Sequence, residues 1–329
     1  MNFYLYFKFS LSICFFLIGY IRMARVLKFY DIPNRRSSHE VKTVTGAGII
    51  FPLSVFLWYY FNYSYHYFLF GLMILTICSI LDDLFDLKVY VRIFIQFLAG
   101  VILLMNFNHT DYNFFLILIC IIFIVGWFNS FNFMDGINGI TGSYSLISLF
   151  TFYYLNLQNH YINQDFIIFS IIPIIFFMFY NFREKAIVFS GNSGTMAMAY
   201  ILSFVMMKLI ISDSHWTYLI FFSVYGVDTI LTIVERLILR ENIFKPHRRH
   251  LYQLLTDKFL YSHLRVSLLY ALSQLIINII FIKFYEIGNN FVTISLFLII
   301  LFFLMVICIY IKIKYFMSAS QINYTNLKS

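Results

Sequence analysis

A cluster of acidic residues is the first feature of this sequence that could do chemistry. Asp82, Asp83 and Asp86 fall within five residues, in the stretch "DDLFD". If a helix continues through them, Asp83 and Asp86 share one face. Like charges this close repel one another, and a divalent cation removes the repulsion. Oxygen ligands favour Mg²⁺ or Mn²⁺ over zinc. For a single aspartate, a solvated helix end is an equally good explanation.

A second stretch, "NSFNFMDGINGI" (129–140), places polar residues three apart between apolar runs. Asn129, Asn132 and Asp135 would lie on one face of a helical turn, with Asn138 next in phase. Amides both donate and accept hydrogen bonds, which suits sugar hydroxyls, phosphate oxygens or a uracil edge. The glycines that close the stretch permit a tight turn and close approach of a ligand. The alternative is a patch of hydrogen bonds between membrane helices.

Three further polar stretches accompany these two: "DIPNRRSSHEVKTVTGAG" (31–48), "FSGNSGT" (189–195) and "HRRHLYQ" (247–253). The first two place glycines before a helix, a pattern suited to phosphate at a helix N-terminus. The third combines histidines with arginines, which can hold phosphate oxygens. A basic patch on anionic lipid is its alternative. Asp228 either lines the same cavity or caps a neighbouring helix.

The elements that must position these residues are membrane helices. The chain is 61% hydrophobic and 12% charged, with a mean hydropathy of +0.82, too apolar for a soluble domain. Apolar runs long enough to span a bilayer recur from end to end, and spans in lipid must be helical or form a closed barrel. We predict one all-α, polytopic membrane domain, 1–329, with about eleven transmembrane helices. The expected spans lie near 3–21, 45–61, 65–81, 91–107, 113–128, 143–159, 166–182, 195–212, 216–235, 266–284 and 291–311.

The first span is predicted to be an uncleaved anchor. Arg22, Arg25 and Lys28 follow it, where a signal peptide would have small residues at a cleavage site. The cysteines all fall inside apolar spans, which favours small core residues over disulfides or metal ligands. They are Cys14, Cys78, Cys120 and Cys308.

The distribution of positive charge predicts which side the polar loops face. With the N-terminus outside, the expected inner loops and C-terminal tail contain all of the 23 Lys and Arg residues except Lys8, Lys208 and Lys283. Those three lie at opposite helix ends, where long side chains snorkel. The positive-inside rule therefore places the C-terminus and the polar loops in the cytoplasm. We expect a cytoplasmic active site and interpret the net charge of +8 as a membrane-face feature without nucleic-acid binding.

The order of these stretches carries a resemblance. "DIPNRRSSH", "DDLFD", "NSFNFMDGINGI", "GNSGT" and "HRRHLYQ" follow one another over about residues 25–260. This combination resembles the polyprenyl-phosphate N-acetylhexosamine-1-phosphate transferases, a bacterial glycosyltransferase family (family 4) of polytopic membrane enzymes. The motifs "RSSH" and "HRRHLYQ" are similar to those of the branch of the family that starts O-antigen or capsule units.

The resemblance implies a reaction and its partners. An N-acetylhexosamine-1-phosphate passes from a UDP-sugar to undecaprenyl phosphate, which releases UMP and starts a lipid-linked glycan. The implied cofactor is Mg²⁺ (or Mn²⁺). The implied partners are a UDP-N-acetylhexosamine, undecaprenyl phosphate and the lipids of the bacterial inner membrane, with a homodimer left open. Among donors, we favour a deoxy-N-acetylhexosamine, although one group changes binding by only about 1–3 kcal/mol.

The resemblance also assigns residues to roles. It implies that Asp82, Asp83 and Asp135 are catalytic and bind the metal, with Asn192 as a further metal ligand. It assigns substrate binding to Asn34, Arg36, Ser37, Asn129, Asn132, Asn138, His247, Arg248 and His250.

Departures from the family pattern leave alternatives open. Relatives usually carry an acid at the positions of Asn138 and Asn192, and often Arg and Gly at those of Thr45 and Ala47. An amide can ligate Mg²⁺ but brings no charge. A catalytically impaired scaffold of glycan assembly is therefore one alternative. A secondary transporter is another, although transporters usually place their site at the membrane midplane and show repeats.

Overall fold

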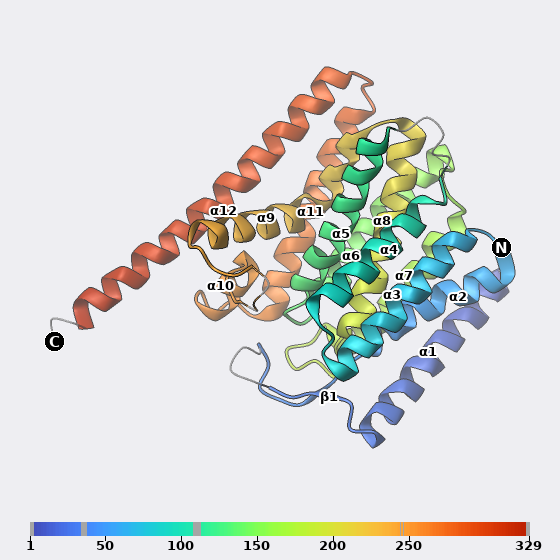
Figure 1. The fold of residues 1–329 in the computed structure, drawn as a ribbon, viewed down its shortest axis with the longest axis horizontal. Coiled ribbons are helices and arrows are strands. Elements are labelled where there is room, and N and C mark those ends of the chain that lie inside the picture. Colours follow the sequence, from blue (N-terminus) through green and yellow to red (C-terminus); the bar gives the residue numbers. More distant parts are fainter. Residues whose placement is uncertain (1–2, 34–37, 108–112, 244, 246, 327–329) are drawn as a thin grey trace.

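The chain is described here by a computed structural model that covers residues 3–33, 38–107, 113–243, 245 and 247–326, with side chains between residues 4 and 314. Most of these residues are helical (Figure 1). The α-helices are α1 Phe3–Val26, α2 Ile50–Asn62, α3 His66–Phe85, α4 Val89–Leu104, α5 Phe114–Phe133, α6 Ile140–Asn159, α7 Gln164–Asn181, α8 Gly191–Asp213, α9 Ser223–Ile238, α10 Leu251–Asp257, α11 His263–Tyr285 and α12 Asn290–Asn326. The shorter elements are the 3₁₀ helices η1 Ala47–Ile49 and η2 Trp216–Phe222 and the strands β1 Tyr30–Asp31 and β2 Thr43–Val44.

The helices confirm an all-α, polytopic membrane protein. Within the described residues, eight helical segments are long and apolar enough to cross a membrane, and α4 and the η1–α2 segment are shorter apolar helices. α6 coincides with a further expected span but is less apolar, because hydroxyl and amide side chains alternate with its apolar ones. The expected count of eleven spans is therefore not confirmed.

Local signals begin several of these helices where the sequence changes from polar to apolar. The side chains of Asn113, Asn163 and Ser262 cap α5, α7 and α11 by accepting hydrogen bonds from backbone N–H groups of the first turn. These N-terminal N–H groups have no partner within the helix, so a capping side chain stabilises the start by about 1 kcal/mol.

α8 forms the centre of the bundle. It packs against α3 and α5, and most of its side chains are buried. Small residues allow neighbouring helices to approach closely. Gly71 of α3 is one such point, because a Cβ there would lie 2.0 Å from the hydroxyl oxygen of Tyr200 in α8. The central helix thus has a fixed position relative to α3, which ends in the acidic cluster.

The ninth expected span, near 216–235, consists of two elements. η2 leads into α9, which in Figure 1 runs crosswise to α11 and points towards α12. α9 buries Asp228, Thr232 and Arg236, spaced four apart along one face. A polar stripe of this kind needs polar partners rather than lipid. α12 contacts α9, and its C-terminal part extends beyond the bundle (Figure 1).

A small sheet closes the polar end of the bundle. β1 and β2 pair antiparallel, with Tyr30 opposite Val44 and Asp31 opposite Thr43. Val44 also forms a parallel bridge with Val188 in the loop before α8. These strands are not predictable from the sequence, because each has only two residues. The sheet ties the first polar stretch to the loop that begins α8.

Candidate active site

A cavity of about 650 Å³ lies at the polar end of the bundle. Its volume falls in the range of small-molecule sites. Side chains from β1, the ends of α3, α5 and α7, the start of α8 and the segment after α9 line it. Six of the predicted site residues are among them: Asp83, Asn132, Asp135, Asn138, Asn192 and Arg248. Stretches more than 160 residues apart in the sequence therefore meet in one polar site.

The adjacent aspartates at the end of α3 have different surroundings. Asp83 lines the cavity and accepts hydrogen bonds from the N–H groups of Asn192, at 3.1 Å, and Ser193, at 3.3 Å. Asp82 accepts from Arg92 at 3.2 Å, from the N–H of Leu87 at 2.9 Å and from the side chain of Asn192 at 2.9 Å. Asp82 is thus engaged on both oxygens beside the cavity. Asp86 is exposed and ends α3 in a left-handed conformation. The helix therefore does not continue through Asp86, and the expected shared face of Asp83 and Asp86 does not form.

Asp135 is half-buried and lies between two hydroxyl groups. Its carboxylate accepts hydrogen bonds from the hydroxyl groups of Thr141 and Ser190, one on each oxygen. Burial raises the pKa of this carboxyl above its usual range, and the two hydroxyl groups partly oppose that shift. The two hydroxyl groups therefore hold this carboxylate in place at the wall of the cavity.

The two glycine-rich stretches interlock with each other. The N–H groups of Ala47 and Gly48 donate to the carbonyls of Phe189, at 2.9 Å, and Ser190, at 3.0 Å. A Cβ on Gly48 would lie 2.5 Å from the Cα of Gly194. The N–H groups that begin α8 bond to Asp83. The amino end of α8 thus receives a carboxylate of the protein, where the sequence pattern predicted a phosphate.

The two predicted asparagines of α5 have different surroundings. Asn132 lines the cavity, and its Oδ1 accepts from the hydroxyl of Thr195 at 2.7 Å. Asn129 lies a turn earlier and forms an amide pair with Gln96, with its Nδ2 2.6 Å from Oε1. Asn129 therefore matches the alternative of a hydrogen bond between membrane helices, since it connects α5 to α4.

Asn138 lies at the wall of the cavity and holds two loops together. Its Nδ2 donates to the carbonyls of Arg183, at 2.8 Å, and Glu184, at 3.0 Å. Its own carbonyl accepts from the hydroxyl of Ser267 at 2.7 Å. A carboxylate cannot donate, so an acid at this position would place a negative charge against two carbonyl oxygens. These two donated hydrogen bonds explain why position 138 carries an amide rather than a carboxylate.

One of the predicted residues of the basic stretch, 247–253, lines the cavity. Arg248 lines the cavity, bonds to both oxygens of Asp257 at 2.7 and 2.8 Å, and donates to the hydroxyl of Ser38 at 3.2 Å. His250 is buried behind it, with Nδ1 3.5 Å from Oδ1 of Asp228. His247 is half-buried next to His250, with ring centroids 5.0 Å apart. Within the described residues, neither histidine is among those that line the cavity.

The surroundings of His247 determine its charge. Burial and the nearby charges of His250 and Arg236 lower the pKa of His247 to about 4. The imidazole is therefore neutral at pH 7. It cannot act as a cation for phosphate at that pH, in contrast to Arg248.

Several cavity residues were not chosen from the sequence. Asp31 and His39 come from the first polar stretch, with the His39 Nε2 3.9 Å from a carboxylate oxygen of Asp31. Gln253 and His263 come from the segment after α9. Asp31, His39 and Gln253 stood within quoted motifs, which was an available signal. His263 belongs to no motif, and only the fold brings it to Asn138, whose N–H donates to its Nδ1 at 3.4 Å.

Three residues assigned to substrate binding cannot be placed. Asn34, Arg36 and Ser37 lie outside the described residues. Their neighbours Ser38 and His39 line the cavity, and the Ser38 hydroxyl donates to the carbonyl of Gly136 at 2.7 Å.

The cavity can be tested as a site for Mg²⁺. Within the described part of the chain, no group of three or more Asp, Glu, His or Cys residues is arranged to hold a metal ion. Of the residues predicted to bind the metal, Asp83, Asp135 and Asn192 line the cavity. Mg²⁺ is commonly bound by one or two carboxylates together with substrate phosphates. The residues therefore fit Mg²⁺ as an ion shared with a bound diphosphate, and do not form a complete cage.

Comparisons with known proteins agree with this site. Residues 65–210 match the model of glycosyl transferase family 4, so the match runs from the start of α3 through most of α8. The chain is 28% identical over 257 residues to an undecaprenyl-phosphate alpha-N-acetylglucosaminyl 1-phosphate transferase from Thermotoga maritima. That alignment covers 75% of this chain and 79% of the relative. Both matches confirm the resemblance seen in the polar stretches.

Proposed function

We propose that the chain belongs to the polyprenyl-phosphate hexosamine-1-phosphate transferase family, which the family match over residues 65–210 and the 28% identical relative support, and that it transfers an N-acetylhexosamine-1-phosphate from a UDP-sugar to undecaprenyl phosphate. The observation that carries this proposal is the meeting of Asp83, Asp135 and Arg248 in one cavity at an end of the membrane helices. A lipid phosphate at the interface and a soluble nucleotide sugar can both reach such a place.

The reaction joins two anions. An oxygen of the lipid phosphate attacks the phosphorus that carries the sugar, and the new bond forms as the bond to UMP breaks. Catalysis of this kind requires positioning and neutralisation of charge more than covalent chemistry by the protein. A bound Mg²⁺ would supply charge neutralisation on the diphosphate, with Asp83 and Asp135 as its protein ligands.

The residues of the chain then have separate roles in the proposal. Asp83 is held by two long backbone hydrogen bonds, at 3.1 and 3.3 Å, so lone pairs remain for a proton of the lipid phosphate. Asp135 orients the donor from the wall of the cavity. Arg248, fixed by Asp257, attracts the donor diphosphate, and Asn132 offers an amide to the nucleotide or sugar. Asp82 sets the position of the Asn192 side chain.

A transfer assay tests the proposal. The purified chain in detergent is incubated with labelled UDP-N-acetylglucosamine, undecaprenyl phosphate and Mg²⁺, and label is counted in the organic phase. We expect labelled lipid with the wild type and a loss of about 10²–10³-fold in Asp83→Asn and Asp135→Asn, the scale of losing one group that stabilises charge in the transition state. Asp86→Asn is the matched control, because Asp86 is exposed and the left-handed conformation accepts asparagine.

The outcomes separate the function classes. Labelled lipid that depends on Asp83 and Asp135 supports the transferase. Uptake of label into sealed vesicles without a lipid product would indicate a transporter. A folded wild-type chain with neither activity over a panel of UDP-N-acetylhexosamines, deoxy forms included, would indicate a scaffold. The same panel, read by mass spectrometry of the lipid product, identifies the sugar and hence the class of glycan that is started.

We propose that the protein lies in the bacterial inner membrane, with the cavity in the cytoplasm and the N-terminus outside.

A further inference from the structure

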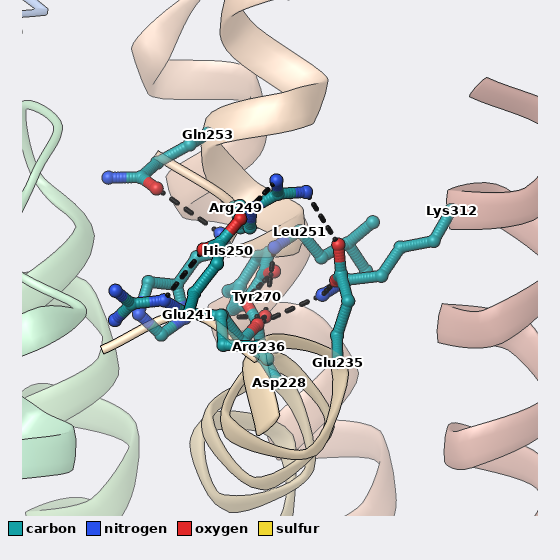
Figure 2. A network of polar contacts seen from close by, with 11 residues as sticks. Asp228, Glu235, Arg236, Glu241, Arg249, His250, Leu251, Gln253, Tyr270 and Lys312 are labelled. Carbon is teal, nitrogen blue, oxygen red and sulfur yellow. Dashed lines mark hydrogen bonds and ion pairs between the residues drawn. The ribbon is translucent and has the colours of Figure 1, made fainter. Parts of the chain in front are cut away.

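The segment after α9, described at residues 239–243, 245 and 247–263, supplies one wall of the cavity and has little regular structure of its own. It contains Arg248, Gln253 and His263, which line the cavity, and the short helix α10. A segment of this kind needs contacts from its surroundings to hold a fixed conformation. Figure 2 shows a network of polar side chains next to it, in which α9, α11 and α12 all take part.

The network begins at a lysine of α12. Lys312 is buried and points towards Glu235 (Figure 2). Its Nζ lies 2.8 Å from Oε2 of Glu235 and 2.9 Å from the hydroxyl oxygen of Thr232. The side chains of Lys312 and Glu235 are 8% and 18% exposed, so water screens this ion pair little. Because both partners lie on α9, the ammonium group fixes α12 to one face of that helix.

Glu235 bridges Lys312 and the segment after α9. Its second oxygen, Oε1, accepts from Nη1 of Arg249 at 3.0 Å. Arg249 also donates to Glu241 at 2.6 Å, and Glu241 accepts from Arg236 at 3.2 Å. Arg236 is buried and donates to the carbonyls of residues 242, 243 and 245. The chain of contacts from Lys312 thus reaches the backbone on the N-terminal side of Arg248.

A second branch reaches the C-terminal side of Arg248. The hydroxyl of Thr232, which accepts from Lys312, lies 3.3 Å from Oδ1 of Asp228. The same carboxylate accepts from the N–H of Leu251 at 2.8 Å and from the hydroxyl of Tyr270 at 2.8 Å. Lys312 therefore contacts the starting points of both branches, and Arg248 lies between the points where the two branches meet the segment.

We infer that Lys312 is a positioning residue that anchors the Arg248 segment to the C-terminal helix. Loss of its charge leaves Glu235 with one cation and takes a hydrogen-bond donor from Thr232 in a buried place, which is costly. The segment then samples other conformations, and Arg248 spends less time facing the cavity. The effect on kinetics rests on the proposed function, whereas the effect on the segment's order does not.

Hydrogen–deuterium exchange of the full-length protein in nanodiscs tests the anchor independently of activity. Lys312→Met keeps the length of the side chain and removes the charge. Lys314→Met is the matched control, because Lys314 lies two residues on in α12 and is exposed. We expect Lys312→Met to speed exchange about tenfold in peptides from 239–258, while peptides from α3 and α8 stay unchanged. Lys314→Met should match the wild type throughout.

Transfer kinetics give the second readout. A fold that is merely destabilised lowers the amount of active enzyme and leaves the KM values as they were. Loss of positioning at Arg248 instead raises the KM for the UDP-sugar, by about tenfold, which corresponds to about 1.4 kcal/mol of binding. The KM for undecaprenyl phosphate should stay within about twofold. Lys312→Arg, which keeps a charged donor, should restore most of the wild-type KM.

A double-mutant cycle identifies the partner. If Lys312 acts through Glu235, the effects of Lys312→Met and Glu235→Gln on exchange are not additive. Additive effects would overturn the proposed route through Glu235. Unchanged exchange in 239–258 in Lys312→Met would overturn the anchor itself. An absence of transfer in the wild type, together with faster exchange in Lys312→Met, would reject the proposed function and keep the anchor.

Discussion

The carboxylate of Asp83 lies over the amino end of α8, where it accepts a hydrogen bond from the N–H of Asn192 at 3.1 Å. A helix N-terminus attracts anions through its unpaired N–H groups and its dipole, so α8 stabilises this charge. The side chain of Asn192 turns to the other acid and donates to Asp82 at 2.9 Å. One residue thus contacts both aspartates and holds the acidic cluster together through neutral donors.

Asn192→Asp should exchange this neutral contact for a third negative charge. We expect a lower melting temperature without divalent cations, because the new carboxylate repels Asp82 and Asp83. Saturating Mg²⁺ should stabilise the variant by about 1–3 kcal/mol more than the wild type, since a ligand that binds only the folded state adds stability. Thermal unfolding in detergent with and without Mg²⁺ measures both effects. An equal response to Mg²⁺ in the two proteins would contradict the placement of the cation at this cluster.

Asn138→Asp should damage the fold rather than improve the site. The change removes the donors to the carbonyls of Arg183 and Glu184 and buries a charge beside them, at a cost of about 2–4 kcal/mol. Asn113→Asp is the control, because Asn113 caps α5 as an acceptor, and aspartate caps equally well. Melting temperatures of the two variants should differ clearly. If Asn138→Asp melts like the control, the amide does not hold the two loops as described.

Gly194→Ala should separate the two interlocked glycine stretches. The added Cβ would lie 2.6 Å from the Cα of Gly48, and backbone cannot move aside as a flexible side chain can. Overpacking of this kind costs about 1–3 kcal/mol, and the shift would also displace Ser190 from Asp135. Gly126→Ala adds the same methyl group in open space and should leave stability equal or slightly higher. Comparing unfolding and transfer activity of the two variants tests the close approach.

The neutral state of His247 predicts a pH dependence of stability. The pKa is about 4 in the folded chain against an ordinary value of 6.5. Between about pH 4 and pH 6.5, the unfolded chain therefore binds a proton that the folded chain does not, and stability is lost as the pH falls through this window. In His247→Asn, melting temperature should depend less on pH between 4 and 6.5 than in the wild type. An identical pH dependence would show that His247 is not buried as a neutral group.

The sequence predicted the fold class because apolar length alone identifies helices in lipid, where the backbone has no other partners. The sequence also pointed to Asp83, Asp135 and Arg248, which all line the cavity, since charged and polar residues between the apolar runs are few. α9 was less predictable. In the sequence, its polar residues fall within an apolar span. Their partner Lys312 lies far along the chain, so the sequence alone does not show what these residues contact.

The remaining differences concern neighbours that are distant in sequence. Asn129 and Asn132 have the same residue type and the same helical face, and only the position of Gln96 on α4 separates a helix contact from a cavity residue. His250 stands two residues from Arg248 but is buried against Asp228. Spacing within a motif predicts which side chains are near one another, and the packing of other helices decides which of them face the cavity.

The most direct measurement follows the phosphorus atom that carries the sugar. UDP-N-acetylglucosamine labelled with ³²P at this position, or the best donor of the panel, is incubated with purified chain, undecaprenyl phosphate and Mg²⁺. Transfer of sugar-1-phosphate predicts that the label moves into the organic phase and that unlabelled UMP is released in equal amount. Labelled UDP left in the aqueous phase, with sugar but no label on the lipid, would contradict the account.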